Sequence, residues 1–237
     1  MPPSQGGNVI QGADNAGLGP IPTPTNRSQL VADALREAIL RGELEPGTAI
    51  VERDIAAKLQ VSKTPVREAL RLLRSSGLIE EIPYRGVSVA RVTPELVTAG
   101  YELRLMLEPA ATELSCLRGQ AETAAAAREA FTEAAEHARV ENRAALALAN
   151  RRFHRALYSF CGNDLLVPIL DGLQDRMAFI AVAGWRRSKT WETEAEEHRL
   201  ILEAVEAGDA ESARRHAHDH IAKSLERMIP PNESETT

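Results

Sequence analysis

The sequence predicts a mainly α-helical protein, with an N-terminal winged helix-turn-helix that carries a small β-hairpin wing and an all-helical bundle behind it. Apolar residues recur at helical spacing through most of residues 27–228. Two short runs, 78–82 and 87–90, interrupt that pattern, and β-branched residues with a nearby Gly predict a hairpin there. The 43% hydrophobic and 26% charged residues are typical of a globular protein.

The two ends of the 237-residue chain differ from this pattern. Residues 1–26 contain five Pro and five Gly, so we expect a disordered tail there, and residues 230–237 form a polar, flexible tail. No apolar run approaches the roughly 18 residues that a membrane helix needs. The N-terminus lacks a secretory signal, and Cys116 and Cys161 form no CxxC motif. These features predict a cytoplasmic protein without a membrane partner.

Three helices are expected in the first domain, residues 27–92. The first has its apolar residues on one face and ends at Gly42. The second covers residues 52–59, and a tight turn at Gln60 and Val61 follows it. Ser62 then occupies the N-cap position of the third helix, which carries Pro65 in its first turn and ends at Gly77.

The second domain, residues 93–229, is expected to contain only helices. Thr93 suits an N-cap, and Pro94 suits the first helical position. Glycines mark the breaks between most of the helices that follow. The expected helices cover residues 94–117, 120–142, 143–161, 164–181, 189–207 and 209–228, with breaks at Gly119, Gly162, Gly184 and Gly208.

The order helix, helix, tight turn, helix, hairpin is typical of a winged helix-turn-helix. The N-terminal end of its third helix normally enters the major groove of DNA, and Lys63, Thr64 and Arg67 lie there. Residues 27–92 carry a net charge of +2 while residues 93–237 carry −7, which favours the first domain as the one that meets a polyanion. Alternatively, the arginines form an ordinary solvated face on which Arg67, Glu68 and Arg71 pair locally.

The run from Ile55 to Leu73, with Ser62-Lys63-Thr64-Pro65-Val66-Arg67-Glu68-Ala69-Leu70 at its centre, resembles the GntR family of bacterial transcription regulators. The resemblance implies a homodimer whose winged domains bind a palindromic operator in double-stranded DNA. The family often has Gly where this chain has Gln60, so a positive φ there would cost on the order of 1 kcal/mol. The expected DNA contacts are Arg53, Ser62, Lys63, Thr64, Arg67, Arg71 and the wing residues Arg85 and Gly86.

The remainder resembles the FadR-type branch of this family, which carries an all-helical FCD effector domain. The matching segments include residues 104–111, 150–154, 197–201 and 208–221, so that the whole resemblance covers about residues 28–228. It implies a regulator, by default a repressor, that responds to a small-molecule effector. A small organic or sugar acid, and hence a carboxylate, is the effector class that the resemblance suggests.

The resemblance also implies a metal site on Asn150, His154, His198 and His220. Asn150 and His154 are four residues apart and so share one side of a helix. Three imidazoles and one oxygen suit a first-row divalent metal ion, with zinc or nickel expected first. The family often has Asp where this chain has Asn150, so either the metal is held more weakly or the pocket binds an anion without metal.

Other charged and histidine side chains leave alternatives open. Arg104 either faces the cavity and pairs with a carboxylate effector or pairs with Glu108 one turn away. His216 is an alternative metal ligand, and we expect His137 and His218 to face solvent.

Two other classes of protein compete with a regulator. A metal-dependent enzyme fused to a nucleic-acid module is disfavoured, because the sequence has no Glu-x-x-His pair, no HExxH, no phosphate-binding GxxxxGK[ST] and no GxSxG. A dimeric DNA-binding protein whose helical domain is purely structural remains the other alternative. The sequence therefore predicts no catalytic residues.

Overall fold

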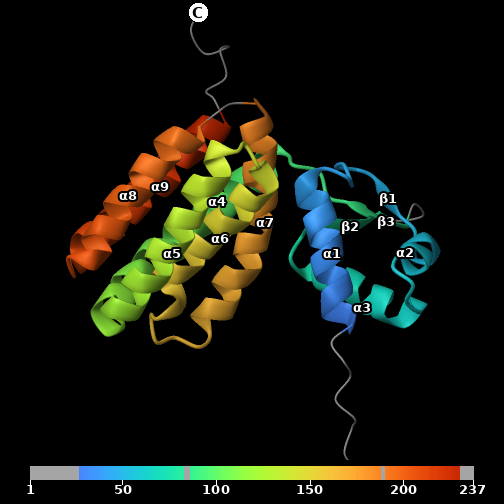
Figure 1. Cartoon of the computed structure of the whole chain (residues 1–237), viewed down its shortest axis with the longest axis horizontal. Coiled ribbons are helices and arrows are strands. Elements are labelled where there is room, and N and C mark those ends of the chain that lie inside the picture. The colour runs from blue at the N-terminus through green and yellow to red at the C-terminus, as the bar shows by residue number, and fades with distance from the viewer. Residues whose placement is uncertain (1–26, 83–85, 188–189, 230–237) are drawn as a thin grey trace, which may run out of the picture.

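The computed structural model describes residues 27–82, 86–187 and 190–229. Its elements form two groups that lie side by side in Figure 1. The expected tails, residues 1–26 and 230–237, lie outside the described residues. The first group consists of α1 (Arg27–Arg41), β1 (Ala49–Ile50), α2 (Glu52–Lys58), α3 (Lys63–Ser75), β2 (Ile79–Ile82) and β3 (Gly86–Val89). The second consists of α4 (Pro94–Arg118), α5 (Gln120–Arg139), α6 (Arg143–Ser159), α7 (Leu166–Arg187), α8 (Trp191–Glu206) and α9 (Ala210–Met228). The predicted mainly helical fold with an N-terminal winged helix-turn-helix is confirmed.

The sheet of the first group contains a strand that the sequence analysis missed. β2 and β3 form the expected antiparallel hairpin, with Ile79 opposite Val89. β1 pairs antiparallel with the other edge of β3, so the strand order is β1-β3-β2. A strand of two residues shows no alternation of its own, so its pattern could not be recognised without its partner.

The turn between α2 and α3 has the strained backbone that the sequence analysis considered. Gln60 has a φ of 54°, where glycine is normally favoured. Ser62 occupies the N-cap position of α3 with an extended backbone, but its side chain makes no capping hydrogen bond. The expected position of the cap was therefore right, and the expected bond was wrong. At α4, by contrast, Thr93 Oγ1 accepts the expected bond from the Leu96 amide, at 3.3 Å.

One expected break in the helical domain is absent. α7 continues through Gly184 and ends at Arg187. A glycine in a helix interior costs only about 1 kcal/mol relative to alanine. Leu170, Met177 and Ile180 of the same helix are buried, and packing of this kind outweighs such a cost.

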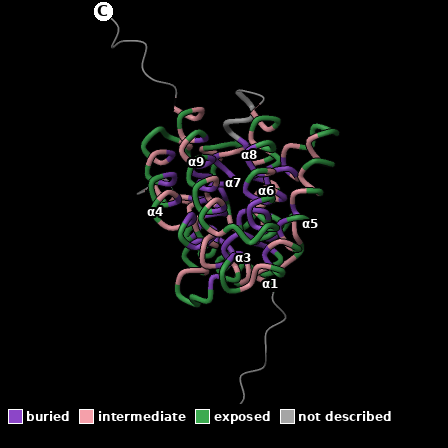
Figure 2. Tube along the Cα trace, turned by 90° about the vertical axis from the view of Figure 1, so that its left-hand side faces the viewer, coloured by how far each residue is buried: buried purple, intermediate pink, exposed green. Residues whose placement is uncertain are grey.

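The two groups share a hydrophobic core. Leu35 and Ile39 of α1 belong to the same buried cluster as Ala147 of α6 and Phe179 of α7. Figure 2 shows buried segments facing inward between the helices and exposed segments on the outside. The winged part is therefore packed on the bundle through α1. Among the described residues, no helix is long and apolar enough to cross a membrane.

Candidate DNA-binding surface and buried histidine cluster

The exposed face of α3 carries the cations that the sequence analysis singled out. Val66, Ala69 and Leu73 bury the opposite face of the helix against its own domain. The outward face and its surroundings hold most of the expected DNA contacts, all exposed: Arg53, Ser62, Lys63, Thr64, Arg67, Arg71 and Gly86. Arg85 lies outside the described residues. Because the apolar stripe faces inward, the N-terminal end of α3 is open to a large partner.

Arg67 and Arg74 on this face have acidic partners outside α3. Arg67 Nε donates to Glu52 Oε2 on α2, at 2.7 Å, instead of pairing with Glu68. Glu68 accepts from the Ser28 hydroxyl instead. Arg74 pairs with Glu81 of β2. Both pairs line a groove of about 270 Å³ between α3 and the sheet.

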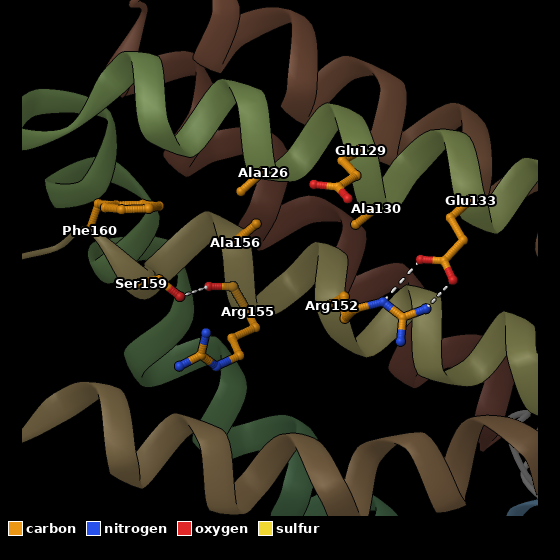
Figure 3. Close-up of a pocket in the computed structure, with 9 residues that line it drawn as sticks. All are labelled: Ala126, Glu129, Ala130, Glu133, Arg152, Arg155, Ala156, Ser159 and Phe160. Carbon is orange, nitrogen blue, oxygen red and sulfur yellow. Dashed lines mark hydrogen bonds and ion pairs between the residues drawn. The ribbon is translucent and has the colours of Figure 1, made fainter.

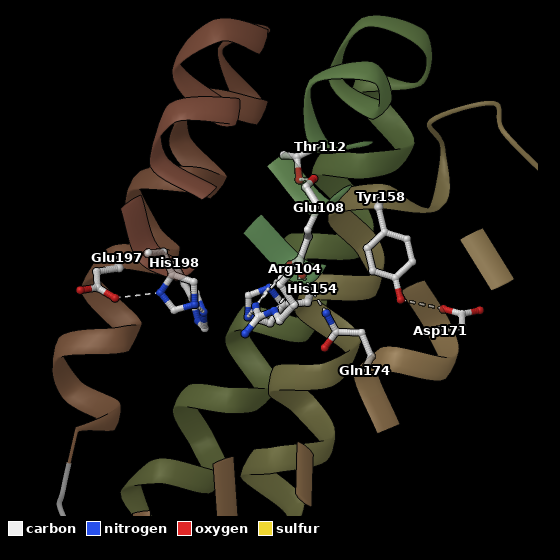
Figure 4. A network of polar contacts seen from close by, with 10 residues as sticks. Arg104, Glu108, Thr112, His154, Tyr158, Asp171, Gln174, Glu197 and His198 are labelled. Atoms are coloured by element: carbon white, nitrogen blue, oxygen red, sulfur yellow. Dashed lines mark hydrogen bonds and ion pairs between the residues drawn. The ribbon is translucent and has the colours of Figure 1, made fainter. Parts of the chain in front are cut away.

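Three histidines converge inside the helical domain, as the sequence analysis expected. His154 comes from α6, His198 from α8 and His220 from α9, and all three are buried. One ring nitrogen of each lies within 4.8 Å of the others. The Nε2 atoms of His198 and His220 are 3.1 Å apart. Figure 4 shows His154 and His198 facing the same interior space from different helices.

Two of these rings each have a carboxylate next to their Nδ1 atom. The sequence analysis predicted neither carboxylate as part of the site. His220 Nδ1 lies 2.7 Å from Glu197 Oε2, and Arg227 donates to the same carboxylate at 2.8 Å. His154 Nδ1 lies 2.5 Å from Glu108 Oε1. A carboxylate on Nδ1 fixes the ring and leaves Nε2 free for a ligand, which is the usual arrangement of metal-binding histidines.

Arg104 is paired within the chain. Its Nε donates to Glu108 Oε2 at 2.9 Å, which is the second of the two alternatives that the sequence left open. Its Nη2 also lies 3.2 Å from Nε2 of His154. Gln174 Nε2 donates to Glu108 Oε2 at 3.0 Å. Glu108 therefore joins Arg104, His154 and Gln174 in one buried network (Figure 4).

Burial and these partners set the protonation of the cluster. Burial lowers the pKa of His154 to about 4, although Glu108 opposes the shift. Burial and the neighbouring histidines also lower the pKa of His198 well below its usual value. Burial disfavours an ionised Glu197, but hydrogen bonds from His220 and Arg227 outweigh this and lower its pKa to about 2. His154 and His198 are therefore neutral at pH 7, which is the form that binds a metal ion.

The donor set fits a divalent metal ion. Two imidazole nitrogens bound to one ion at about 2.0–2.1 Å each lie roughly 3 Å apart, as the Nε2 atoms of His198 and His220 do. On His154 the guanidinium of Arg104 faces Nε2, so an ion that took this nitrogen would displace that contact. Asn150 is half-buried and lines a small cavity of about 40 Å³ together with His198. Its role as a fourth ligand remains a prediction.

The remaining histidines lie outside the cluster. His216 is half-buried, His137 lies 3.4 Å from Glu133, and His218 is exposed beside Asp219. A separate groove of about 260 Å³ runs between α5 and α6 (Figure 3). Its arginines are already paired, Arg152 with Glu133 and Arg155 with Asp171. The positive charges that line this groove are therefore compensated within the chain.

Comparisons with known proteins match both parts of the chain. The family described as "Bacterial regulatory proteins, gntR family" matches residues 27–89 of this chain, and the family described as "FCD domain" matches residues 99–223. The chain is 32% identical to a probable D-xylose utilization operon transcriptional repressor of Paenarthrobacter nicotinovorans, over 86% of this chain and 89% of that protein. It is 25% identical to the galactonate operon transcriptional repressor of Escherichia coli K12, over 86% of this chain and 97% of that protein.

A solved structure has the same architecture. It is described as a transcriptional regulator GntR from Rhodococcus sp. RHA1 and matches with a TM-score of 0.75 and 26% identity. The match covers 86% of this chain and 98% of that one. Both parts of the chain, the winged domain and the helical bundle, therefore occur together in known regulators.

Proposed function

The chain belongs to the GntR family of bacterial regulatory proteins and carries an FCD domain, and we propose that it is a repressor that binds a palindromic operator as a homodimer. It is a DNA-binding transcriptional regulator, and the proteins it resembles are regulators rather than enzymes. We propose further that a small organic or sugar acid, bound at a metal ion in the helical domain, modulates operator binding.

The outward cations at the start of α3 carry the DNA-binding part of the proposal. Lys63 and Thr64 lie beside the N-terminal end of a helix dipole, which favours phosphate. Arg67 keeps its terminal nitrogens available for a guanine, because Glu52 engages only its Nε. Arg53 and Arg71 extend the positive surface toward the backbone of the duplex, and Gly86 marks the wing. In a homodimer two such helices would enter successive major grooves.

The histidine cluster supports the effector part. His154, His198 and His220, with Asn150, would hold the metal, which would supply a positive charge for the oxygens of a carboxylate. Glu197 holds His220 in the tautomer that leaves Nε2 free. Arg104 is the second cation of the cavity, and it would turn from Glu108 toward a carboxylate effector. One relative is named for the operon of galactonate, a sugar acid.

Regulation requires that the effector binds one arrangement of the dimer more tightly than the other. Without that difference it could not change operator affinity, however tightly it bound. Release of the operator on effector binding is the response that we propose. The domain boundaries at residues 92 and 93 would then separate the part that reads DNA from the part that responds.

A second candidate rests on the pairing of Arg104 with Glu108. Because this pair is fully buried, the main cation of the cavity is already neutralised. A helical domain that only dimerises would keep such a pair permanently. Zinc and carboxylate binding, measured as shifts in melting temperature, separate this candidate from a working sensor, since a purely structural bundle would give no shift.

In vitro selection from a randomised duplex library tests the proposed function. The full-length protein should enrich one inverted repeat, with half-sites about one helical turn apart. Light scattering should give the mass of two chains for the free protein and of two chains plus one duplex for the bound protein. Recovery of unrelated sequences without a repeat, or a monomer in both samples, would contradict the proposal.

A further inference from the structure

Three consecutive residues of α7 contact three different parts of the molecule. Gln174 donates to Glu108 in the buried histidine network, at 3.0 Å. Asp175 Oδ2 lies 3.2 Å from Arg36 Nη2 on α1. Arg176 Nε donates to the carbonyl of Ser76, the C-cap of α3, at 3.4 Å. Successive residues of a helix point about 100° apart, so one turn of α7 reaches the cavity, α1 and α3 at once.

The contact to α1 is an ion-pair junction between the two domains. The carboxylate of Asp175 is only 8% exposed, and it also lies 2.7 Å from Arg151 Nε on α6. Arg36 belongs to α1, the helix that packs the winged domain on the bundle. Removal of the Asp175 carboxylate would leave two partly buried guanidinium groups without the negative charge between them, which is destabilising. Asp175 therefore fixes α1 to both α6 and α7.

The guanidinium of Arg176 lies directly against the backbone at Gly77. Gly77 has a φ of 72°, and a Cβ at this position would lie 2.0 Å from Nη2 of Arg176. The guanidinium thus covers the backbone directly after the helix that we propose to enter the major groove. A shift of α7 at this point would act on the end of α3 directly through the Arg176 side chain.

We propose that residues 174–176 of α7 transmit changes in the histidine cavity to the winged domain. This inference rests on the proposed function, because it names the route by which the effector cavity regulates DNA binding. Glu108 accepts hydrogen bonds from Arg104, His154 and Gln174. A ligand that binds Arg104 or His154 removes one of the hydrogen bonds that Glu108 accepts, and this changes the position of Glu108 relative to Gln174. Since α7 is a continuous helix there, movement at Gln174 carries Asp175 and Arg176 with it.

Hydrogen–deuterium exchange on the full-length protein, without DNA, tests this route. Gln174→Met removes the bond to Glu108 and keeps the side-chain volume. It should speed amide exchange in α1 and at residues 76–78 by at least about fivefold, the lower end of ordinary coupling between sites. The same substitution in an Asp175→Asn background should add less than about twofold in α1. Asp171→Asn is the matched control, because Asp171 lies one turn earlier on α7 and pairs only within the bundle, with Arg155 and Tyr158.

The exchange experiment and the operator selection can fail independently of each other. Operator selection can succeed or fail whatever the exchange shows, because no DNA is present in the exchange experiment. Far-ultraviolet circular dichroism identifies variants that have lost their fold, and Gln174→Leu replaces Gln174→Met if needed. Unchanged exchange in α1 for a folded Gln174 variant would overturn the inference. The inference would also be overturned if Gln174→Met speeded exchange in α1 equally with and without Asp175→Asn. That result would place the route elsewhere, for example in α4.

Discussion

Glu52, in the first turn of α2, holds Nε of Arg67, on the exposed face of α3, at 2.7 Å. A side chain with many rotamers is thereby held in one orientation before any DNA is present. The terminal nitrogens of the guanidinium remain available for a bidentate contact. The pair also brings a negative charge close to the surface that would meet phosphate, so it opposes unspecific binding.

We therefore expect Glu52→Gln to reduce discrimination between sequences. Loss of the carboxylate frees Arg67 and removes a repulsion, so affinity for random duplex should rise while affinity for the selected operator rises less or falls. The ratio of the two affinities should fall by about three- to tenfold, a loss of roughly 1 kcal/mol of specificity. Anisotropy titrations with both duplexes at one salt concentration measure this ratio of affinities. Glu81→Gln, which removes the partner of Arg74, is the matched control and should leave the ratio unchanged. An unchanged ratio in Glu52→Gln would contradict the expectation.

The histidine cluster should bind zinc, and His154→Ala should weaken that binding by at least about tenfold. Even residues behind a metal ligand commonly contribute 10- to 100-fold to affinity. Competition with a chromogenic chelator gives the zinc affinity of each variant. His216→Ala is the control, because His216 lies on α9 outside the cluster and should bind zinc as the parent does. Equal zinc affinity in His154→Ala and the parent would remove this residue from the site.

The position of α3 depends on its buried stripe. Leu73 is 0% exposed while its neighbour Leu72 is 42% exposed. Leu73→Ala should lower the free energy of unfolding by about 2–5 kcal/mol, because it leaves a cavity under α3. Leu72→Ala should cost no more than about 0.5 kcal/mol. Urea unfolding followed by circular dichroism compares the two. Similar costs for both leucines would mean that α3 packs with a different face inward.

Stability should decline at alkaline pH because of Tyr101. Burial raises its pKa to about 12, whereas a tyrosine in the unfolded chain ionises near pH 10. The folded state therefore holds this proton more tightly. Stability should be intact below pH 10 and fall between pH 10 and 12, by up to about 3 kcal/mol.

Urea unfolding at several pH values tests this expectation, with Tyr101→Phe as the comparison. The variant should lose less stability over the same interval. A difference in absorbance at 295 nm between parent and variant should appear only near pH 12. Its appearance near pH 10 would show that Tyr101 ionises as an exposed tyrosine does.

The limits of several helices in both domains could be predicted because their signals are local. Thr93 and Pro94 begin α4 through their own chemistry, and Gly42 ends α1 within one turn. The strand β1 could not be predicted, since Ala49 and Ile50 form it only by pairing with β3. The continuation of α7 through Gly184 was also missed, because tertiary packing outweighs a weak local preference.

The site could be predicted only in part for the same reason. The three histidines of the cluster were expected from the resemblance, and the structure brings them together. Glu108 and Gln174 are 66 residues apart, and Glu197 lies 23 residues before His220. No local pattern pairs such residues. The pairing of Arg67 with Glu52 could not be predicted either, because the two residues are 15 apart and lie on different helices, whereas Glu68 is adjacent to Arg67.

The most direct test of the account is a titration of the selected operator with a variant of Arg67. Arg67→Gln should weaken operator binding by about 1–3 kcal/mol, or roughly 5- to 150-fold, if this side chain reads a base. Arg214→Gln is the matched control, because Arg214 is also an exposed arginine paired with a glutamate, but it lies on α9. It should bind within about twofold of the parent. Equal affinity of Arg67→Gln and the parent would contradict the claim that the N-terminal end of α3 binds DNA.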